Sequence, residues 1–336
     1  RCLLHEKPFA GLNGSGKHNN WSISTDEGVN LLSPGETPHD NAQFLLFLCA
    51  VIKAVDDYQD LLRISVATAG NDLRLGAQEA PPAIVSIFLG DELNAVLESL
   101  ENDTPYCGVK KTKMKLGVDV LPKFTKDNTD RNRTSPFAFT GNKFEFRMVG
   151  SADSIACANI MLNSAVAESL RVYADYLEQA PDFQSALQEM LKNTIKEHKR
   201  IIFNGNGYDD AWIQEATLKR GLSNYPSTPD CVPHILDRKN VELLTGQKIY
   251  TEPELRARYE IVLENYCKSI VIEANTMVDM AEKEILPAIT AYAMELAKTA
   301  AAKKALNEQI TCAFECERVK TLSALTDEIA LKIQEL

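Results

Sequence analysis

The spacing of hydrophobic and polar positions changes near residue 150, and this change separates two kinds of predicted element. Upstream of it, apolar residues recur at helical spacing over residues 41–63 and 84–100, which predicts two helices. Three segments alternate between apolar and polar positions and are predicted as strands: residues 18–25, 112–121 and 142–148. Long loops rich in Gly, Pro and Asn connect these elements.

Downstream of residue 150, nearly every segment has helical spacing. The predicted helices cover residues 154–179, 182–203, 209–221 and 252 to the C-terminus. A loop with three prolines precedes the last of them. That last region carries an apolar seam formed by Leu255, Tyr259, Val262, Tyr266, Ile270 and Ile272. Interruptions at Pro287 and near Cys312 divide it into two or three long antiparallel helices, which is typical of a scaffold or an assembly surface.

The predicted fold class is α+β, and the predicted domain boundary lies at about residue 153. Residues 1–153 mix strands and helices, whereas residues 154–336 form a helical region that ends in long antiparallel helices. The chain has 336 residues, of which 45% are apolar and 25% are charged, so it is long enough for two domains. This composition excludes collagen-like and wholly disordered proteins.

The net charge of the chain is −11, from 36 Lys and Arg against 47 Asp and Glu. This acidic balance argues against a general surface for nucleic acid or for an anionic membrane, so any phosphate site must be local and built from a few cations. The longest apolar run, residues 44–55, contains Lys53 and is too short to cross a bilayer. We therefore expect a soluble protein that binds neither nucleic acid nor membranes.

The eight cysteines are scattered, most of them in apolar stretches, and no pair has the spacing of a zinc ribbon or a redox motif. We expect reduced thiols in the core and a cytoplasmic protein. The chain also begins on Arg1 within a strand-like segment, without a methionine. This start suggests the C-terminal part of a longer protein.

Residues 11–18 have the spacing of a phosphate-binding P-loop, except that His18 occupies the place of the Ser or Thr that binds magnesium. A P-loop opens a helix, whereas the residues after His18 alternate like a strand, so a P-loop nucleotidase does not fit. The alternation places four polar side chains on one face: His18, Asn20, Ser22 and Ser24. This pattern is typical of a wall of a ligand site, and a solvent-facing sheet surface has the same pattern.

The predicted strand around Glu145 is a more specific indication of a binding site. Alternation places Lys143, Glu145 and Arg147 on one face, with Phe144 and Phe146 on the core face. A carboxylate between two cations suits a site that holds a metal ion and phosphate oxygens, because the carboxylate can bind the metal while the guanidinium clamps the anion. The alternative is a surface ladder of cross-strand ion pairs, which is common and contributes little stability.

Two loops add ionisable residues to these strands. Residues 71–82 contain Arg74, Glu79 and a diproline stop, which is typical of a mobile lid that carries an ionisable group and also of a plain surface loop. Residues 131–136 contain Arg131 and Arg133.

Four segments resemble the glutamine synthetase family, in this order along the chain: residues 7–18, 71–82, 131–133 and 143–147. Three segments resemble the type III branch in particular: residues 5–11, 19–22 and 79–84. This branch is the large bacterial form with a long helical C-terminal extension. The resemblance covers most of the chain. It implies the C-terminal part of a mainly antiparallel, curved-sheet catalytic domain with flanking helices, followed by the helical extension. It also implies that a β-grasp domain and the first catalytic strands precede Arg1.

Resemblance to this family implies an ATP-dependent ligase that joins ammonia to the γ-carboxylate of L-glutamate. The γ-carboxylate takes the γ-phosphoryl group of ATP, and ammonia then displaces phosphate from γ-glutamyl phosphate to give glutamine. Two divalent ions, Mg²⁺ or Mn²⁺, clamp this transfer. The resemblance also implies a homo-oligomer of stacked rings, a dodecamer, in which the N-terminal domain of a neighbouring subunit completes each active site.

The resemblance assigns a role to individual residues. His18 and Glu145 would bind the metal that bridges the ATP phosphates, while Arg133 and Arg147 would stabilise the charge on the phosphoryl group in transfer. Glu79 would be the flap carboxylate that covers the site and accepts a proton from the ammonium ion. Glutamate would be bound by Asn13, Gly14 and Arg74, with Arg74 on the α-carboxylate. The nucleotide would be contacted by Asn20, Ser22 and Lys143.

Some features of the family are missing from this sequence. Asn20 stands where a second histidine is common, an adenine-stacking arginine near Lys143 is absent, and residues 135–138 lack a further arginine. The glutamates for the other metal would lie upstream of Arg1, so we expect the chain alone to have no synthetase activity. Two alternatives stay open, a γ-glutamyl ligase for another amine and a non-catalytic assembly or regulatory relative. The retained candidate metal-binding and catalytic residues speak against the second.

Overall fold

The computed structural model describes residues 16–76, 80–106, 108 and 135–335. Over these residues the chain is mainly helical and contains one four-stranded sheet, in the strand order β1-β4-β3-β2. The chain divides into two compact units, Arg1–Leu263 and Glu264–Leu336. The predicted α+β class is confirmed.

The sheet belongs to the first unit and consists of β1 (Gly16–Trp21), β2 (Ile87–Phe88), β3 (Phe137–Phe139) and β4 (Phe144–Gly150). The central strand β4 pairs antiparallel with both β1 and β3, whereas β2 and β3 are parallel. The sheet is therefore small and mixed. The strand predicted over residues 142–148 is confirmed as β4, while the candidate at 112–121 lies outside the described residues.

The pairing of β1 with β4 contains a β-bulge. Lys17 faces Val149 and Asn19 faces Phe146, so two residues of β4, Arg147 and Met148, lie opposite His18 alone. A bulge bends the strand that carries the extra residue and redirects its side chains. It therefore determines how the polar residues of the two strands meet.

The aromatic face of the sheet forms part of the hydrophobic core. Phe137, Phe144 and Phe146 are fully buried, and the rings of Phe137 and Phe144 stack with their centroids 4.7 Å apart. Phe44 of α1 (Ala42–Asp57) contacts Phe139 across a centroid distance of 5.9 Å. The alternation predicted around Glu145 is confirmed, because the apolar side chains of β4 point into this core.

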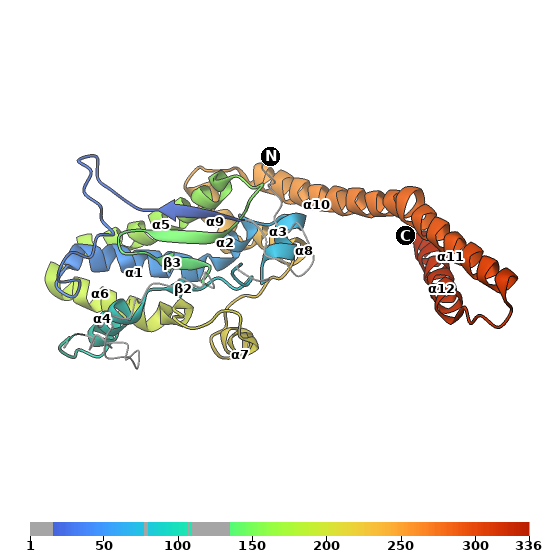
Figure 1. Cartoon of the computed structure of the whole chain (residues 1–336). Helices are drawn as coiled ribbons and strands as arrows, with labels where there is room; N and C mark the ends of the chain where they lie inside the picture. Colours follow the sequence, from blue (N-terminus) through green and yellow to red (C-terminus); the bar gives the residue numbers. More distant parts are fainter. Residues whose placement is uncertain (1–15, 77–79, 107, 109–134, 336) are drawn as a thin grey trace, which may run out of the picture. The chain divides into compact units, whose positions relative to one another are not determined.

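Three long helices, α1, α5 (Ile155–Glu178) and α6 (Phe183–His198), pack together beside the sheet (Figure 1). Ser154 caps α5 by accepting a hydrogen bond from the backbone N–H of Ala156, and Asp182 caps α6 by accepting from Ser185. The helix predicted over residues 154–179 is confirmed. The one predicted over 182–203 is confirmed up to His198, where a 3₁₀ turn (Lys199–Ile201) follows.

The remaining helices of the first unit are short: α2 (Gln59–Ile64), α3 (Ala69–Arg74), α4 (Asp91–Glu101), α7 (Asp210–Gln214), α8 (Thr228–Cys231) and α9 (Arg238–Gly246). The helix predicted over residues 41–63 is divided at Tyr58 into α1 and α2. The helix predicted over 209–221 starts as α7 and continues as a π-helical turn (Glu215–Lys219). The proline-rich loop contains α8 and a 3₁₀ turn (Val232–Leu236), because proline is tolerated in the first turn of a helix.

The helix predicted over residues 84–100 is wrong in its first half. Ile87 and Phe88 form β2, and α4 begins only at Asp91. Every residue from 84 to 89 is buried, and spacing alone does not distinguish a short buried strand such as β2 from a buried helix. Gly90, with φ of +82°, separates the strand from the helix.

The C-terminal region consists of α10 (Glu252–Met280), a π-helical turn (Ala281–Ile285), α11 (Leu286–Leu306) and α12 (Ala313–Glu335). The interruptions predicted at Pro287 and near Cys312 agree with the π-helical turn and with the connection between α11 and α12. The apolar seam predicted for α10 is wrong beyond Leu263, because Ile270 and Ile272 are 41% and 64% exposed. Within the described residues, no helix is both long and apolar enough to cross a membrane.

The expectation that the cysteines are core thiols holds for only part of the set. Cys49, Cys231 and Cys312 are buried and free, whereas Cys267 and Cys316 are exposed. Burial raises the pKa of Cys49 to about 12, so its thiol stays protonated at neutral pH. The exposed pair lies in the C-terminal helices, where few side chains are buried.

Candidate active site

The two candidate metal ligands lie on neighbouring strands. The Nδ1 atom of His18 is 3.7 Å from Oε2 of Glu145, and the two side chains are 30% and 20% exposed. His18 stands opposite the bulge of β4, and Glu145 pairs with Asn20 across the antiparallel ladder. The structure therefore brings together an imidazole and a carboxylate that are 127 positions apart in the sequence.

Arg147 completes this cluster. Arg147 is only 4% exposed, and its Nε atom donates a hydrogen bond of 3.1 Å to the same Oε2 atom of Glu145. One carboxylate oxygen thus lies between a histidine ring and a guanidinium group. Such a charge-assisted hydrogen bond fixes the direction of both side chains.

The donor set of His18 and Glu145 fits a divalent cation. Two donors bound to one ion at roughly 2.0 to 2.3 Å lie about 3 to 4 Å apart, which matches the separation of these atoms. A carboxylate oxygen suits Mg²⁺ or Mn²⁺, and a neutral imidazole suits Mn²⁺ and other transition metals. These two side chains would hold the ion, and Arg147 stands beside it as a fixed cation.

The candidate nucleotide ligands follow the same face of the sheet. Asn20 is exposed, and its amide donates to the backbone carbonyl of His18 at 3.2 Å. The hydroxyl of Ser22 bonds to Oδ1 of Asn30 at 2.9 Å and to the carbonyl of Asn142 at 3.2 Å. Lys143 is half-buried at the start of the next strand. Their contact with a nucleotide stays a prediction.

Arg74 occupies an interior position. It is 2% exposed, and its guanidinium donates to the backbone carbonyls of Arg147 at 2.9 Å and Met148 at 3.2 Å. A Cβ atom on Gly16 would lie 2.1 Å from the NH2 atom of Arg74, so the guanidinium packs directly on the backbone of β1. The alternative of a plain surface loop does not hold for Arg74, because Arg74 is buried and ends helix α3. Its predicted contact with the α-carboxylate of glutamate stays a prediction.

Four of the predicted site residues lie outside the described residues: Asn13, Gly14, Glu79 and Arg133. Their roles in binding glutamate, in covering the site and in stabilising the phosphoryl group stay predictions.

Comparison with known proteins gives consistent matches. Residues 186–304 match the glutamine synthetase C-terminal domain. The chain is 48% identical over 340 residues to a glutamine synthetase of Butyrivibrio fibrisolvens, and the match covers all of this chain and 48% of the relative. It is 51% identical over 301 residues to the type-3 glutamine synthetase of Dictyostelium discoideum, covering 89% of this chain and 41% of the relative.

A glutamine synthetase of Bacteroides fragilis (strain YCH46) is 40% identical over 345 residues, with 99% of this chain and 47% of the relative covered. Over at least 89% of its length the chain is similar to proteins named glutamine synthetase. The name of the Dictyostelium relative agrees with the type III branch that the sequence resembles. The chain spans about half the length of the curated relatives it matches.

Sequence analysis missed the side chains of α5 that bind β1 by hydrogen bonds. Asn19 donates to Oδ1 of Asn159 at 2.8 Å, and the indole N–H of Trp21 donates to Oδ1 of Asn163 at 2.8 Å. Asn159 and Asn163 are four positions apart on α5 and so lie on one face of that helix. Two asparagines at this spacing share one face of the helix, and this could have indicated polar partners on a neighbouring element.

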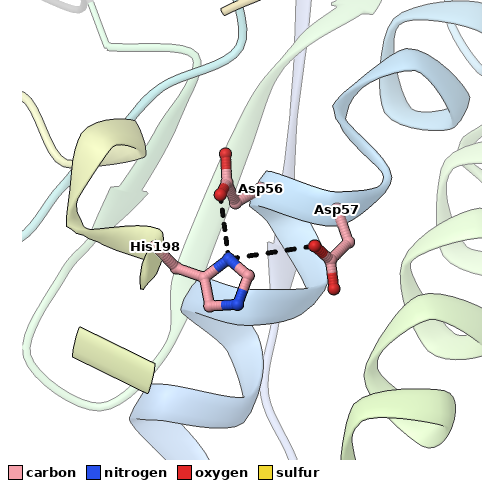
Figure 2. A group of neighbouring side chains, drawn as sticks. All are labelled: Asp56, Asp57 and His198. Atoms are coloured by element: carbon pink, nitrogen blue, oxygen red, sulfur yellow. Dashed lines mark hydrogen bonds and ion pairs between the residues drawn. The ribbon is translucent and has the colours of Figure 1, made fainter. Parts of the chain in front are cut away.

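A second cluster of possible metal ligands lies between α1 and α6. Figure 2 shows His198 between two carboxylates, with Nδ1 2.8 Å from Oδ2 of Asp56 and 3.8 Å from Oδ1 of Asp57. Nε of Arg200 lies 3.0 Å from both oxygens of Asp56, and Nζ of Lys53 lies 2.7 Å from Asp57. Both carboxylates have cationic partners, so in this structure the cluster forms an ion-pair network that joins the two helices.

Proposed function

We propose that the protein is a glutamate–ammonia ligase that makes glutamine from L-glutamate and ammonia at the expense of ATP. The reaction passes through γ-glutamyl phosphate and releases ADP and phosphate. The observation that carries the proposal is the Oε2 atom of Glu145, which lies between His18 and Arg147 on two adjacent strands. The names of the relatives support the same reaction.

In this proposal, His18 and Glu145 hold a divalent ion, Mg²⁺ or Mn²⁺, which when bound polarises the phosphate oxygens of ATP. Arg147, fixed by Glu145, stabilises negative charge on the phosphoryl group as it moves to the γ-carboxylate, and Arg133 acts with it. Asn20, Ser22 and Lys143 contact the nucleotide. A fixed guanidinium is effective here because it does not have to reorient when charge develops.

The second step needs a base and a closed site. Asn13, Gly14 and Arg74 hold glutamate, and Glu79 accepts a proton from ammonium. The resulting ammonia attacks the γ-carbonyl carbon of γ-glutamyl phosphate, so that a C–N bond forms, the C–O bond to phosphate breaks and phosphate leaves. Exclusion of water by the Glu79 loop keeps the acyl phosphate from being hydrolysed.

We further propose a homo-oligomer of stacked rings, a dodecamer, in the cytoplasm. The exposed apolar side chains of the C-terminal helices support assembly, since Ile272, Phe314 and Leu331 are each more than 60% exposed. The mixed sheet described above is, in this proposal, one part of a larger, mainly antiparallel curved sheet of the catalytic domain.

The proposal is tested with the full-length protein by measuring ADP release that depends on glutamate and ammonia. Arg147→Ala should lower kcat by about 100-fold or more, because a preorganised cation at the transferring group is lost. The control is Arg171→Ala, since the Arg171 side chain is 59% exposed and, in the part of the chain that the structure describes, forms ion pairs with Glu168 and Asp175 of its own helix. We expect the control to keep its kcat within about twofold.

Wild-type turnover by the Arg147→Ala protein would refute the assignment. Turnover of the wild type with another amine in place of ammonia would favour a γ-glutamyl ligase of different specificity. A wild-type protein that releases no ADP with any amine would favour a non-catalytic relative.

A further inference from the structure

We propose that Asn71 is a positioning residue for this reaction, because its side-chain amide holds the bulge of β4 at which Arg147 and Met148 lie opposite His18. The inference rests on the proposed function and adds a residue to it. Asn71 contacts neither of the candidate metal ligands in the hydrogen bonds described, so it acts through the backbone of β4.

Asn71 lies in α3 and is completely buried. Its Nδ2 atom donates two hydrogen bonds, at 2.8 Å to the carbonyl of Val66 and at 2.9 Å to the carbonyl of Met148. Its Oδ1 atom accepts a hydrogen bond of 3.2 Å from the guanidinium of Arg74. Both amide hydrogens and the amide oxygen are therefore used, as a buried primary amide requires.

The contact with Met148 falls on the bulge itself. Arg147 and Met148 together face His18, so the regular β1–β4 ladder is interrupted at these two residues. The carbonyl of Met148 accepts from Asn71 and Arg74, and the carbonyl of Arg147 accepts from Arg74. Side chains of α3 thus satisfy backbone groups of the bulge, which is buried and would otherwise leave carbonyl groups without partners.

Helix α3 is itself held firmly on its other side. Asp72 accepts from the NH2 atom of Arg63 at 2.7 Å and from the backbone N–H of Thr228 at 2.5 Å, and Arg63 is 1% exposed. Thr68 caps the helix by accepting from the backbone N–H of Asn71. Because the helix is fixed, the Asn71 amide determines where the bulge lies, and the bulge determines the direction of Arg147.

The test compares Asn71→Ala with Asn240→Ala in the full-length protein. Asn240 is a matched control, since it is also completely buried and its amide also donates two hydrogen bonds, to Asp60 at 2.8 Å and to the carbonyl of His234 at 2.7 Å. We expect both variants to lower the melting temperature. Only Asn71→Ala should lower kcat, by roughly 10- to 100-fold with a KM for ATP within about threefold, because a shift of the order of 1 Å at the reacting groups has that effect.

The second measurement does not depend on activity. Hydrogen exchange of the backbone amides of residues 144–150 should become faster in Asn71→Ala and stay unchanged in Asn240→Ala. Asn71→Ser, which removes less volume and keeps one hydroxyl donor, serves if Asn71→Ala does not fold, and it should show the same two effects to a smaller degree.

An equal loss of kcat in the Asn240 variant, or unchanged exchange in β4 of either Asn71 variant, would overturn the positioning role. A wild-type protein that makes no glutamine would refute the proposed function instead, while the exchange measurement would still decide whether Asn71 holds the bulge.

Discussion

Single residues determine how closely β1 can approach α3. Gly16 begins β1, and the NH2 and Cζ atoms of Arg74 lie 2.1 and 2.4 Å from the position that a Cβ atom on Gly16 would occupy. The guanidinium is buried and bonded to carbonyls of β4, so it cannot move aside without losing those bonds. A glycine is therefore required here for lack of space.

Gly16→Ala should lower the free energy of unfolding by about 1 to 3 kcal/mol, because the added methyl group forces the strand and the guanidinium apart. Urea denaturation followed by tryptophan fluorescence measures this change. The control is Gly246→Ala at the end of α9, where no atom lies within 4 Å of an added Cβ and no loss is expected. Equal stability of both variants would show that Arg74 moves at no cost.

At the scale of elements, one ion pair joins α11 to α12. The ammonium of Lys303 donates a hydrogen bond to the carboxylate of Glu315, which is 6% exposed. The hydrogen bond from Lys303 and that from its own backbone hold the pKa of Glu315 below its ordinary value of 4.5. Few other side chains of this region are buried; two of them are Leu296 in α11 and Cys312 in the connection between α11 and α12.

The sign of the resulting pH dependence follows from the direction of that shift. A carboxyl group with a lowered pKa in the folded state stabilises the fold above its ordinary pKa and loses this contribution as the pH falls through the lowered value. We therefore expect Glu315→Gln to lower the melting temperature of the helices at pH 7, and we expect this difference to become smaller at pH 3, as followed by circular dichroism.

The control for this prediction is Glu308→Gln, since Glu308 is exposed between α11 and α12. It should leave the melting temperature unchanged at both pH values. A difference between wild type and Glu315→Gln that is as large at pH 3 as at pH 7 would show that the contact stabilises the hairpin by packing rather than by charge.

At the scale of the whole molecule, the hydrophobic core of the first unit is formed by residues of that unit alone. Among the described residues, the hydrophobic cluster and the side chains packed against it end at Leu263. Both tryptophans of the chain, Trp21 and Trp212, belong to this cluster, so tryptophan fluorescence reports on the first unit alone.

Removal of residues 264–336 should therefore leave the urea midpoint of the tryptophan signal within experimental error of that of the intact chain, because no buried member of the core is lost. The helical signal in far-ultraviolet circular dichroism should decrease in proportion to the number of helical residues that are deleted. A large drop in the midpoint would show that the second unit stabilises the first.

The sequence by itself determined the elements whose pattern is local. Alternation in period two placed Glu145 and Arg147 on one face of β4 and the phenylalanines in the core, because a strand has only two faces. Helical spacing with a clear capping residue predicted α5 from Ser154 onward. The motifs also selected His18 and Glu145, which the structure brings to 3.7 Å from each other.

Only the tertiary structure decided the features that depend on residues distant in sequence. Ile87 and Phe88 form a strand because they pair with β3 in the buried core, although the spacing of residues 84–89 also suits a helix. The bulge opposite His18, and the use of Asn71 and Arg74 to satisfy its carbonyls, depend on pairings between residues more than 70 positions apart. Backbone hydrogen bonds of this kind carry no local pattern, because any residue offers the same carbonyl group and only the fold determines which donor reaches it.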